Sequence, residues 1–238
     1  MERLPLKSKV LNENQIIAES LRERFREHGV LCLNLISGPG SGKTALLERT
    51  LARLDPATRV CVLTGDIQTD NDARRLAQYG FPVQQITTGG TCHLDGRMIE
   101  KHLAAWNLDD IDLLFIENVG NLVCPSSYDL GEASKIVLLS VTEGEDKPLK
   151  YPSIFFKSDL FVLTKVDLLP YVPFDAEVAE ANARLVHPGI EIVRASSTAE
   201  GGLDAWLVWL GKRMARARQD ALAPAPDTVT AKVEAQVR

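Results

Sequence analysis

The chain has 238 residues, which is enough for one large α/β domain or two small ones. Its 45% of hydrophobic residues can form a packed core, and its net charge of −5 argues against a surface for nucleic acid or an anionic membrane. No apolar signal core follows residues 1–5, and no apolar run is long enough to span a bilayer. We therefore expect a cytoplasmic protein whose partners include no membrane and no nucleic acid.

The two ends of the chain differ from its middle. Residues 1–28 predict an amphipathic helix that packs on the core, because apolar side chains recur every four residues. These apolar positions are Ile17, Leu21 and Phe25. Residues 221–238 are rich in alanine and proline and otherwise polar, which predicts a disordered tail. The segment between them, 29–220, is expected to be the main domain.

From Val30 onward, short leucine-rich and β-branched runs alternate with helical patterns. Several runs are almost wholly apolar, as strands covered on both faces must be. This alternation predicts a three-layer α/β fold, with a mainly parallel sheet between helices. The expected strands are Leu31–Ile36, Arg59–Leu63, Val83–Ile86, Leu113–Ile116, Ile136–Val141, Leu160–Leu163 and Glu191–Val193. A last helix is expected from about Gly202.

The segment SGPGSGKT, residues 37–44, follows the first expected strand and opens a helix. This is the setting of a Walker A phosphate loop, although Ser37 stands where the pattern has its first glycine. Lys43 would neutralise β/γ-phosphate oxygens, and the Thr44 hydroxyl would ligate Mg²⁺. The other expected phosphate-binding residues are Gly38, Gly40, Ser41 and Gly42.

A second segment, Thr164-Lys165-Val166-Asp167, ends a core strand about 120 residues later. The Asp167 carboxylate could accept the N1–H and 2-amino hydrogens of guanine, while the stem of Lys165 lies along the purine. Adenine offers no such pair of donors, so Asp167 predicts a preference for GTP over ATP. A weaker expectation is a backbone contact to the base from Ser196-Ser197.

Two acidic segments are candidates for sensing the γ-phosphate and Mg²⁺. Glu117 and Gly120 follow an apolar strand, where an acid near Mg²⁺ and a glycine N–H near the phosphate are useful. Asp66 and Asp72 follow another strand and would complete the Mg²⁺ shell, orient water, or cap the next helix. We expect Asp66 and Asp72 to be functional, and Asp70 to be a cap or a solvent-exposed residue.

Catalysis is assigned to Lys43, Asp66, Asp72 and Glu117. No arginine occupies an evident finger position beside the phosphate loop, so we expect slow, Mg²⁺-dependent hydrolysis.

Cys92, His93 and Cys124 form a candidate site for Ni²⁺ or Zn²⁺, because thiolates and imidazole suit both ions. Four extended residues span at most ~14 Å, so Cys124 must lie near Gly120. Three ligands leave one position for a partner chain, water or another protein. The remaining cysteines, Cys32 and Cys61, lie inside apolar strand runs and are expected to be in the core.

Taken together, these segments resemble the HypB family of hydrogenase nickel-incorporation GTPases. The resemblance runs from the N-terminal helix to about Arg218, and its blocks are SGPGSGKT, GDIQTDND, CHLDG, ENVGNLVCP, TEGEDKPLKYP and LTKVD. It implies the dimeric, nucleotide-switched branch of P-loop GTPases, with GTP favouring a homodimer. It also implies a metal site of Cys92, His93 and Cys124 at the dimer interface, a zinc-containing partner chaperone of the HypA type, and the hydrogenase large subunit as recipient.

The resemblance leaves some points open. A lysine of the TEGEDKPLKYP block, Lys147 or Lys150, would reach the neighbouring subunit's nucleotide, or the block is a plain surface loop. The first cysteine is Cys32 and the only early histidine is His28, so tight independent nickel binding and nickel storage are not expected. The alternatives are a urease-type nickel-insertion GTPase, a non-metal regulatory P-loop GTPase or small-molecule kinase, and an inactive nucleotide-binding module.

Overall fold

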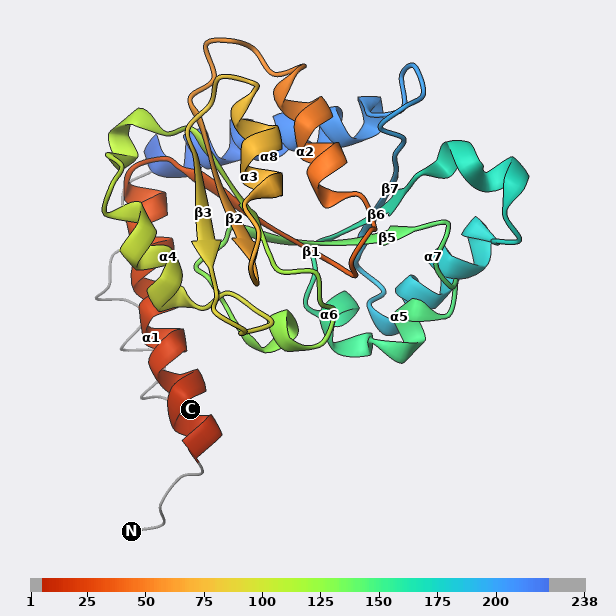
Figure 1. The fold of residues 1–238 in the computed structure, drawn as a ribbon, viewed down its shortest axis with the longest axis horizontal. Coiled ribbons are helices and arrows are strands. Elements are labelled where there is room, and N and C mark those ends of the chain that lie inside the picture. Colours follow the sequence, from red (N-terminus) through yellow and green to blue (C-terminus); the bar gives the residue numbers. More distant parts are fainter. Residues whose placement is uncertain (1–5, 223–238) are drawn as a thin grey trace, which may run out of the picture.

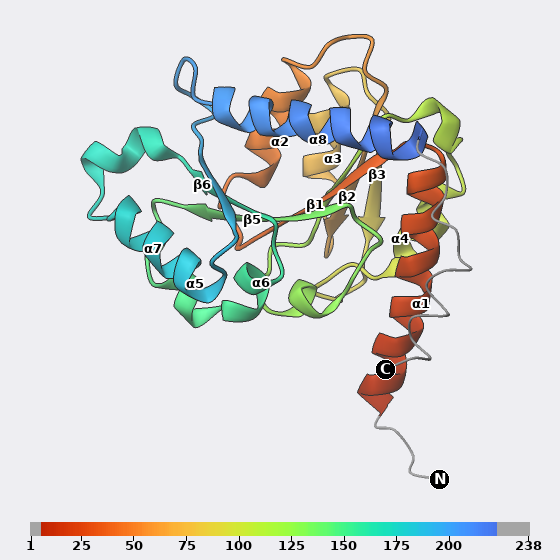
Figure 2. The same cartoon turned by 180° about the vertical axis from the view of Figure 1, so that it is seen from behind.

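A computed structural model of the protein describes residues 6–222 and contains a wholly parallel seven-stranded sheet between two layers of helices (Figures 1 and 2). The strand order is β3-β2-β4-β1-β5-β6-β7. The strands are β1 (Leu31–Ser37), β2 (Val60–Asp66), β3 (Val83–Thr87), β4 (Leu113–Glu117), β5 (Ser134–Ser140), β6 (Leu160–Thr164) and β7 (Glu191–Arg194). The three-layer fold class expected from the sequence is confirmed.

Helices cover both faces of the sheet because its central strands are buried on both sides. One face packs on α2 (Lys43–Leu51), α3 (Asn71–Ala77) and α8 (Asp204–Leu222). On the other face, α1 (Leu6–Glu27) and α4 (Gly96–Leu103) cover one half of the sheet. Helices α6 (Pro152–Phe156) and α7 (Ala176–Val186) cover the other half, and α5 (Lys147–Lys150) packs against them. Figure 1 shows α1 and α4 side by side at one end of the molecule, and α5 to α7 toward the other.

Successive side chains of a strand point to opposite faces of the sheet, and β1 shows how this alternation builds the core. Leu31, Leu33 and Leu35 belong to the cluster that includes the side chains of α2 and α8. Cys32, which points to the opposite face, belongs to the cluster under α1 and α4. Alternate residues of one strand therefore bind the two helix layers to the same sheet.

Several element ends differ from those expected. The expected strands at Arg59 and Ile136 begin at Val60 and Ser134, and most strands run one to three residues further at their carboxyl ends. Most of these extra residues are polar and give no hydrophobic signal, but they pair in register with neighbouring strands. Strand β5 ends at Ser140, one residue before the expected Val141. Helix α8 continues to Leu222, beyond the expected boundary at residue 220, and the rest of the expected tail lies outside the described residues.

The sheet order places the functional segments together. Strand β1 lies between β4 and β5, and the strands that follow it in the chain fall on both sides of it, so a crevice opens beyond the carboxyl ends of these central strands. The phosphate loop follows β1, and the two acidic segments follow β2 and β4. Within residues 6–222, no helix combines the length and apolar character needed to cross a membrane.

Candidate nucleotide and metal site

The phosphate loop joins the end of β1 to the start of α2, which begins at Lys43. Gly40 and Gly42 have φ angles of 76° and 92°, where a side chain would be strained. The loop can therefore turn its backbone N–H groups toward an anion at the helix N-terminus. Lys43 Nζ donates to Ser37 Oγ at 2.8 Å, so the serine that replaces the usual first glycine holds the lysine that was predicted to bind phosphate.

A buried carboxylate faces the start of α2. Thr44 Oγ1 donates to Glu117 Oε1 at 2.7 Å, and Glu117 Oε2 has no hydrogen-bond partner in the described part of the chain. Burial raises the pKa of Glu117 to about 7, and burial also lowers the pKa of Lys43. A buried oxygen without a partner, beside a hydroxyl on the phosphate loop, suits Mg²⁺, which prefers oxygen ligands.

Between these groups lies a pocket of about 510 Å³. Gly120 lies on one side of the pocket, against Pro39 of the phosphate loop. An added Cβ at Gly120 would lie 3.2 Å from Pro39 Cγ, so the close approach of the two loops favours glycine at this position. The lining includes the phosphate loop together with Asp66, Asp72, Arg75, Glu117 and Gly120. The structure thus brings the predicted catalytic residues to one pocket.

The three aspartates at and after the end of β2 take different places. Asp66 Oδ1 accepts from the backbone N–H groups of Gln68 and Thr69, at 2.8 and 2.9 Å. Partial burial raises the pKa of Asp66, but the hydrogen bonds from Thr69 and Gln68 outweigh it and hold that pKa below its usual range. Asp72 lines the pocket, whereas Asp70 forms an exposed ion pair with Arg74 at 2.8 Å and makes no side-chain cap of α3.

One arginine lies beside the pocket, and the sequence had offered none in an evident finger position. Arg75 lines the pocket from α3, and its guanidinium contacts Glu48 through Nε at 3.0 Å and Nη2 at 2.7 Å. It also lies 3.4 Å from Asp72. The spacing of Asp72 and Arg75 by three residues on a helix was the signal in the sequence that could have found it.

The predicted base-recognition segment ends β6. Ser196 Oγ and Thr198 Oγ1 donate to the Asp167 carboxylate at 2.5 and 3.0 Å. The hydrogen bond from Ser196 is the main cause that lowers the pKa of Asp167. Lys165 adopts a left-handed φ of 59°, and its Nζ donates to the Gly40 carbonyl at 2.8 Å. Only a backbone contact to the base was predicted from Ser196, and its side-chain role, like that of Thr198, was missed.

The three predicted metal ligands also meet. The ligand atoms of Cys92, His93 and Cys124 all lie within 4.8 Å of one another, and the two sulfur atoms are 2.8 Å apart. Burial lowers the pKa of His93, which favours the neutral imidazole that ligates metals, and His93 Nδ1 has no hydrogen-bond partner among the described residues. The donor set of two thiols and an imidazole therefore fits Ni²⁺ or Zn²⁺.

Two residues hold the metal loops in place. Asn121 Nδ2 donates to the Cys92 carbonyl at 3.3 Å, and its Oδ1 accepts from Val123 N at 2.8 Å, which ties the two ligand segments together. The Tyr128 ring stacks on His93 with 3.9 Å between centroids. By contrast, Cys32 and Cys61 are buried in the core, and burial raises the pKa of each thiol, that of Cys61 to about 11.

The block 142–152 supplies a residue that the sequence did not point to. The Glu143 carboxylate accepts from Ser41 Oγ at 2.7 Å and from Ser140 N at 2.9 Å, beside the phosphate loop. Lys147 pairs with the same carboxylate at 3.3 Å, whereas Lys150 pairs with Asp146 at the surface. Of the two candidate lysines, Lys147 therefore lies close to the phosphate loop of its own chain.

Comparison with known proteins agrees with this geometry. The family model of the CobW/HypB/UreG nucleotide-binding domain matches residues 32–194. The hydrogenase maturation factor HypB of Escherichia coli strain K12 is 54% identical over 201 residues, which cover 84% of this chain and 69% of that protein. The hydrogenase/urease maturation factor HypB of Helicobacter hepaticus is 49% identical over 171 residues, which cover 70% of each.

A solved structure is similar over almost its whole length. The crystal structure of HypB from Helicobacter pylori in complex with nickel matches with a TM-score of 0.80 and 40% sequence identity, covering 86% of this chain and 96% of that one. The family resemblance stated from the sequence blocks is thus confirmed. The chain belongs to the CobW/HypB/UreG family of nucleotide-binding proteins, and within it to the HypB group.

Proposed function

We propose that the protein is a GTP-hydrolysing nickel metallochaperone that acts in [NiFe]-hydrogenase maturation and couples metal transfer to GTP-dependent dimerisation. The observation that carries the proposal is the nearness of two sites. Cys124 follows Gly120 by four residues, and Gly120 lines the nucleotide pocket while Cys124 lies with Cys92 and His93. The names of the related proteins, and the nickel in one related structure, support the cargo and the pathway.

In this proposal GTP is the substrate and Mg²⁺ its companion ion. Asp167, kept ionised by Ser196 and Thr198, accepts the guanine N–H groups, while the phosphate loop and Lys43 bind the phosphates. Thr44 and Glu117 would hold Mg²⁺, which neutralises the phosphate charge when bound. Asp66 and Asp72 would complete the ion's shell or orient the attacking water.

The metal half of the proposal concerns a cargo that must be released. The cluster supplies three ligands from one chain, whereas a closed zinc site takes four. A second copy of the chain can complete the shell in a GTP-bound homodimer, and a zinc-containing chaperone of the HypA type can hand over nickel there. The hydrogenase large subunit is the recipient, and the cytoplasm, where thiols stay reduced, is the compartment in which the site would work.

Metal titration in two nucleotide states tests this function. Ni²⁺ and Zn²⁺ affinities are measured in the presence of Mg²⁺-GDP and of a non-hydrolysable GTP analogue, with molecular mass followed by light scattering. We expect the analogue to favour the dimer and to change metal affinity by about 5- to 150-fold. Cys92→Ala, His93→Ala and Cys124→Ala should each weaken binding, and Cys32→Ala, the matched buried control, should not. Equal metal affinity in the two states would contradict the coupling.

A urease-type role is the second candidate, because one relative at 49% identity is named for both hydrogenase and urease. Transfer of ⁶³Ni from the loaded protein to the apo forms of each enzyme separates the two. Transfer to apo-urease alone would replace the hydrogenase assignment. Transfer to apo-hydrogenase alone would exclude the second candidate.

A further inference from the structure

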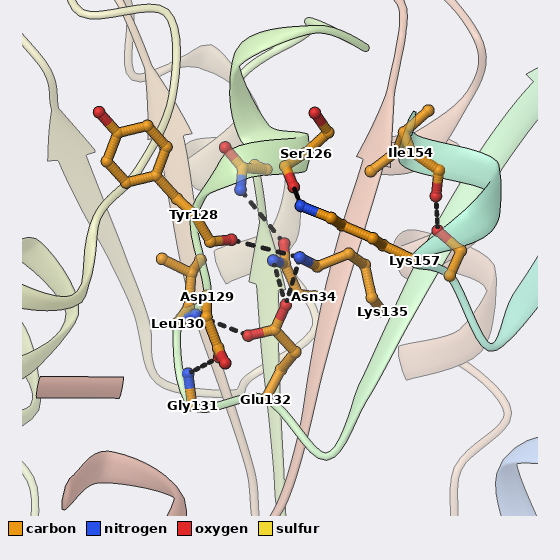
Figure 3. A network of polar contacts seen from close by, with 12 residues as sticks. Asn34, Ser126, Tyr128, Asp129, Leu130, Gly131, Glu132, Lys135, Ile154 and Lys157 are labelled. Carbon is orange, nitrogen blue, oxygen red and sulfur yellow. Dashed lines mark hydrogen bonds and ion pairs between the residues drawn. The ribbon is translucent and has the colours of Figure 1, made fainter. Parts of the chain in front are cut away.

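A chain of buried polar side chains runs beneath the nucleotide and metal loops. It consists of Asn118 after β4, Asn34 in the middle of β1, and Glu132 and Lys135 around the start of β5. All four residues are at most 9% exposed. Figure 3 shows Asn34, Glu132 and Lys135 converging behind the segment of Ser126 to Asp129. Buried polar groups in such a position are costly unless they are paired, so their arrangement is informative.

Each link of the chain is a hydrogen bond or ion pair of ordinary length. Asn118 Nδ2 donates to Asn34 Oδ1 at 3.2 Å, and Asn34 Nδ2 donates to Glu132 Oε1 at 3.0 Å. The other Glu132 oxygen accepts from Leu130 N at 2.7 Å. Lys135 Nζ lies 3.3 Å from Glu132 Oε1 and donates to the Tyr128 carbonyl at 3.2 Å.

The carboxylate of Glu132 gives this chain a single direction. An ionised carboxylate only accepts, so Asn34 must turn its NH₂ group toward Glu132 and its oxygen toward Asn118. Asn118 must then turn its own NH₂ group toward Asn34. Its oxygen is left facing the opposite way, and neither amide can flip without placing two donors or two acceptors against each other.

That oxygen is where the two functional loops meet. Asn118 Oδ1 accepts from Val119 N at 3.0 Å and from Leu94 N at 3.2 Å. Val119 precedes Gly120 of the nucleotide pocket, and Leu94 follows the metal ligand His93. The backbone of Asn118 is itself anchored, because its N–H donates to the Leu35 carbonyl of β1 at 3.0 Å. The backbone that carries this acceptor is therefore held by the sheet, and the acceptor joins the loops on either side of it.

The Lys135 end of this hydrogen-bonded network also reaches the metal ligands. Lys135 holds the carbonyl of Tyr128, whose ring stacks on His93. His93 is thus positioned from both sides by one polar network, through the following N–H of Leu94 and through the stacked ring.

We propose that Asn118, oriented by Asn34 and Glu132, is the residue that couples the γ-phosphate loop to the metal ligands, because one oxygen binds both loops. A γ-phosphate that draws the Val119–Gly120 backbone toward itself weakens the hydrogen bond from Val119 N to this oxygen. The hydrogen bond from Leu94 N then adjusts, and His93 shifts relative to Cys92. Asn118, Asn34 and Glu132 are positioning residues in this account, which rests on the proposed coupling of nucleotide and metal.

The test compares the ratio of Ni²⁺ affinities in the GTP-analogue and GDP states across matched variants. Glu132→Gln keeps the shape of the side chain but supplies a donor, so the amide chain loses its single direction. We expect the ratio to fall to within about threefold of one in this variant, while nucleotide affinity stays at the wild-type value. Asp159→Asn is the control, because Asp159 accepts from Lys135 N at 2.8 Å beside the same network but is no part of the amide chain.

A charge swap provides a rescue. In the double variant Asn34→Asp/Glu132→Gln, the carboxylate at position 34 accepts from Asn118, and the new amide at position 132 donates to it. The orientation of Asn118 is restored, so the affinity ratio should return toward the wild-type value. The double variant also carries the test if Glu132→Gln alone fails to fold.

The outcomes separate this inference from the proposed function. A wild-type ratio of one would overturn both. A wild-type ratio different from one that persists in Glu132→Gln, or a folded double variant whose ratio stays near one, would overturn the role of Asn118 and leave the coupling intact.

Discussion

The nucleotide half and the metal half of the site are built in different ways. The nucleotide half comes from backbone N–H groups, a helix N-terminus and side chains that are already paired, such as Lys43 with Ser37 and Thr44 with Glu117. The metal half comes from side chains on two loops, and His93 Nδ1 has no hydrogen-bond partner in the described structure. The first half is shaped before its ligand arrives, whereas the second is held by neighbours that belong to other loops.

This difference bears on how each half would bind and release its ligand. A preorganised phosphate site binds its ligand with little rearrangement, which favours affinity and specificity. A metal site on loops can change its geometry when a neighbouring loop moves, which favours release of a cargo. Four predictions test this comparison.

The largest effect is expected at the base-recognition residue of the nucleotide half. GTP should bind more tightly than ATP by on the order of 10⁴-fold, because adenine lacks the two N–H donors that guanine offers to the Asp167 carboxylate. Asp167→Asn should remove most of this preference, since one acceptor becomes a donor. The preference is measured by competition of GTP, ATP and xanthosine triphosphate against labelled GDP. Equal affinity of the wild-type protein for GTP and ATP would end the assignment of guanine specificity.

The next largest effect concerns the phosphate-binding lysine. Lys43→Ala should lower kcat for GTP hydrolysis by on the order of 10²- to 10³-fold, as loss of one preorganised donor does elsewhere. If the halves are built independently, Ni²⁺ affinity in the GDP state should remain within about twofold of wild type, well below the typical allosteric effect. Single-turnover hydrolysis and nickel titration on the same preparation check both. A wild-type kcat in Lys43→Ala would show that the loop does not take part in catalysis.

The smallest effect is a pH dependence of Mg²⁺ binding. Burial raises the pKa of Glu117 to about 7, and a protonated carboxyl is a poor metal ligand. Mg²⁺ affinity in the presence of GTP should therefore fall as the pH drops below about 7, by up to about tenfold per pH unit. Glu117→Gln should bind Mg²⁺ weakly at every pH. A wild-type affinity that is flat between pH 6 and 8, within about twofold, would mean that Glu117 does not ligate the ion.

The raised pKa of Glu117 also affects the free energy of unfolding of the nucleotide-free protein. The ordinary pKa of this carboxyl is 4.5 and the folded-state pKa is about 7, so the folded state binds more protons between these values. Stability contributed by this group is present below about pH 4.5 and is lost as the pH rises through 7. Thermal unfolding across that window should show a gentler decline for Glu117→Gln than for the wild type.

Much of the nucleotide half was predictable because its signals are local. The segment from Gly38 to Thr44 specifies a loop and a helix start within seven neighbouring residues, and Asp167 closely follows an apolar strand. The strand candidates were likewise found by their apolar runs, with errors of one to three residues at their ends, most of them at polar residues such as Ser134 and Thr164.

The contacts that sequence reasoning missed join residues far apart in the chain. Arg75 reaches the pocket by packing against Glu48 on another helix, and Glu143 reaches the phosphate loop from the segment after β5. Asn34 resembled any polar residue inside a buried strand until its partners were known. Nothing in the local pattern distinguishes Glu143 from a solvated charge or Asn34 from an isolated amide, and for Arg75 the only local signal was its spacing from Asp72.

The sequence by itself therefore determined the class of fold, the family and the chemistry available at each site, since periodicity and contiguous motifs depend only on neighbours along the chain. It also identified Cys92, His93 and Cys124 as candidate ligands, but their distance from one another depends on where β3 and β4 end in space. Only the tertiary structure decided that these three meet, that Ser196 and Thr198 hold Asp167, and that one amide oxygen joins the two loops. Those facts follow from the order of strands in the sheet, which brings distant segments to one edge and buries their polar groups where each must find a partner.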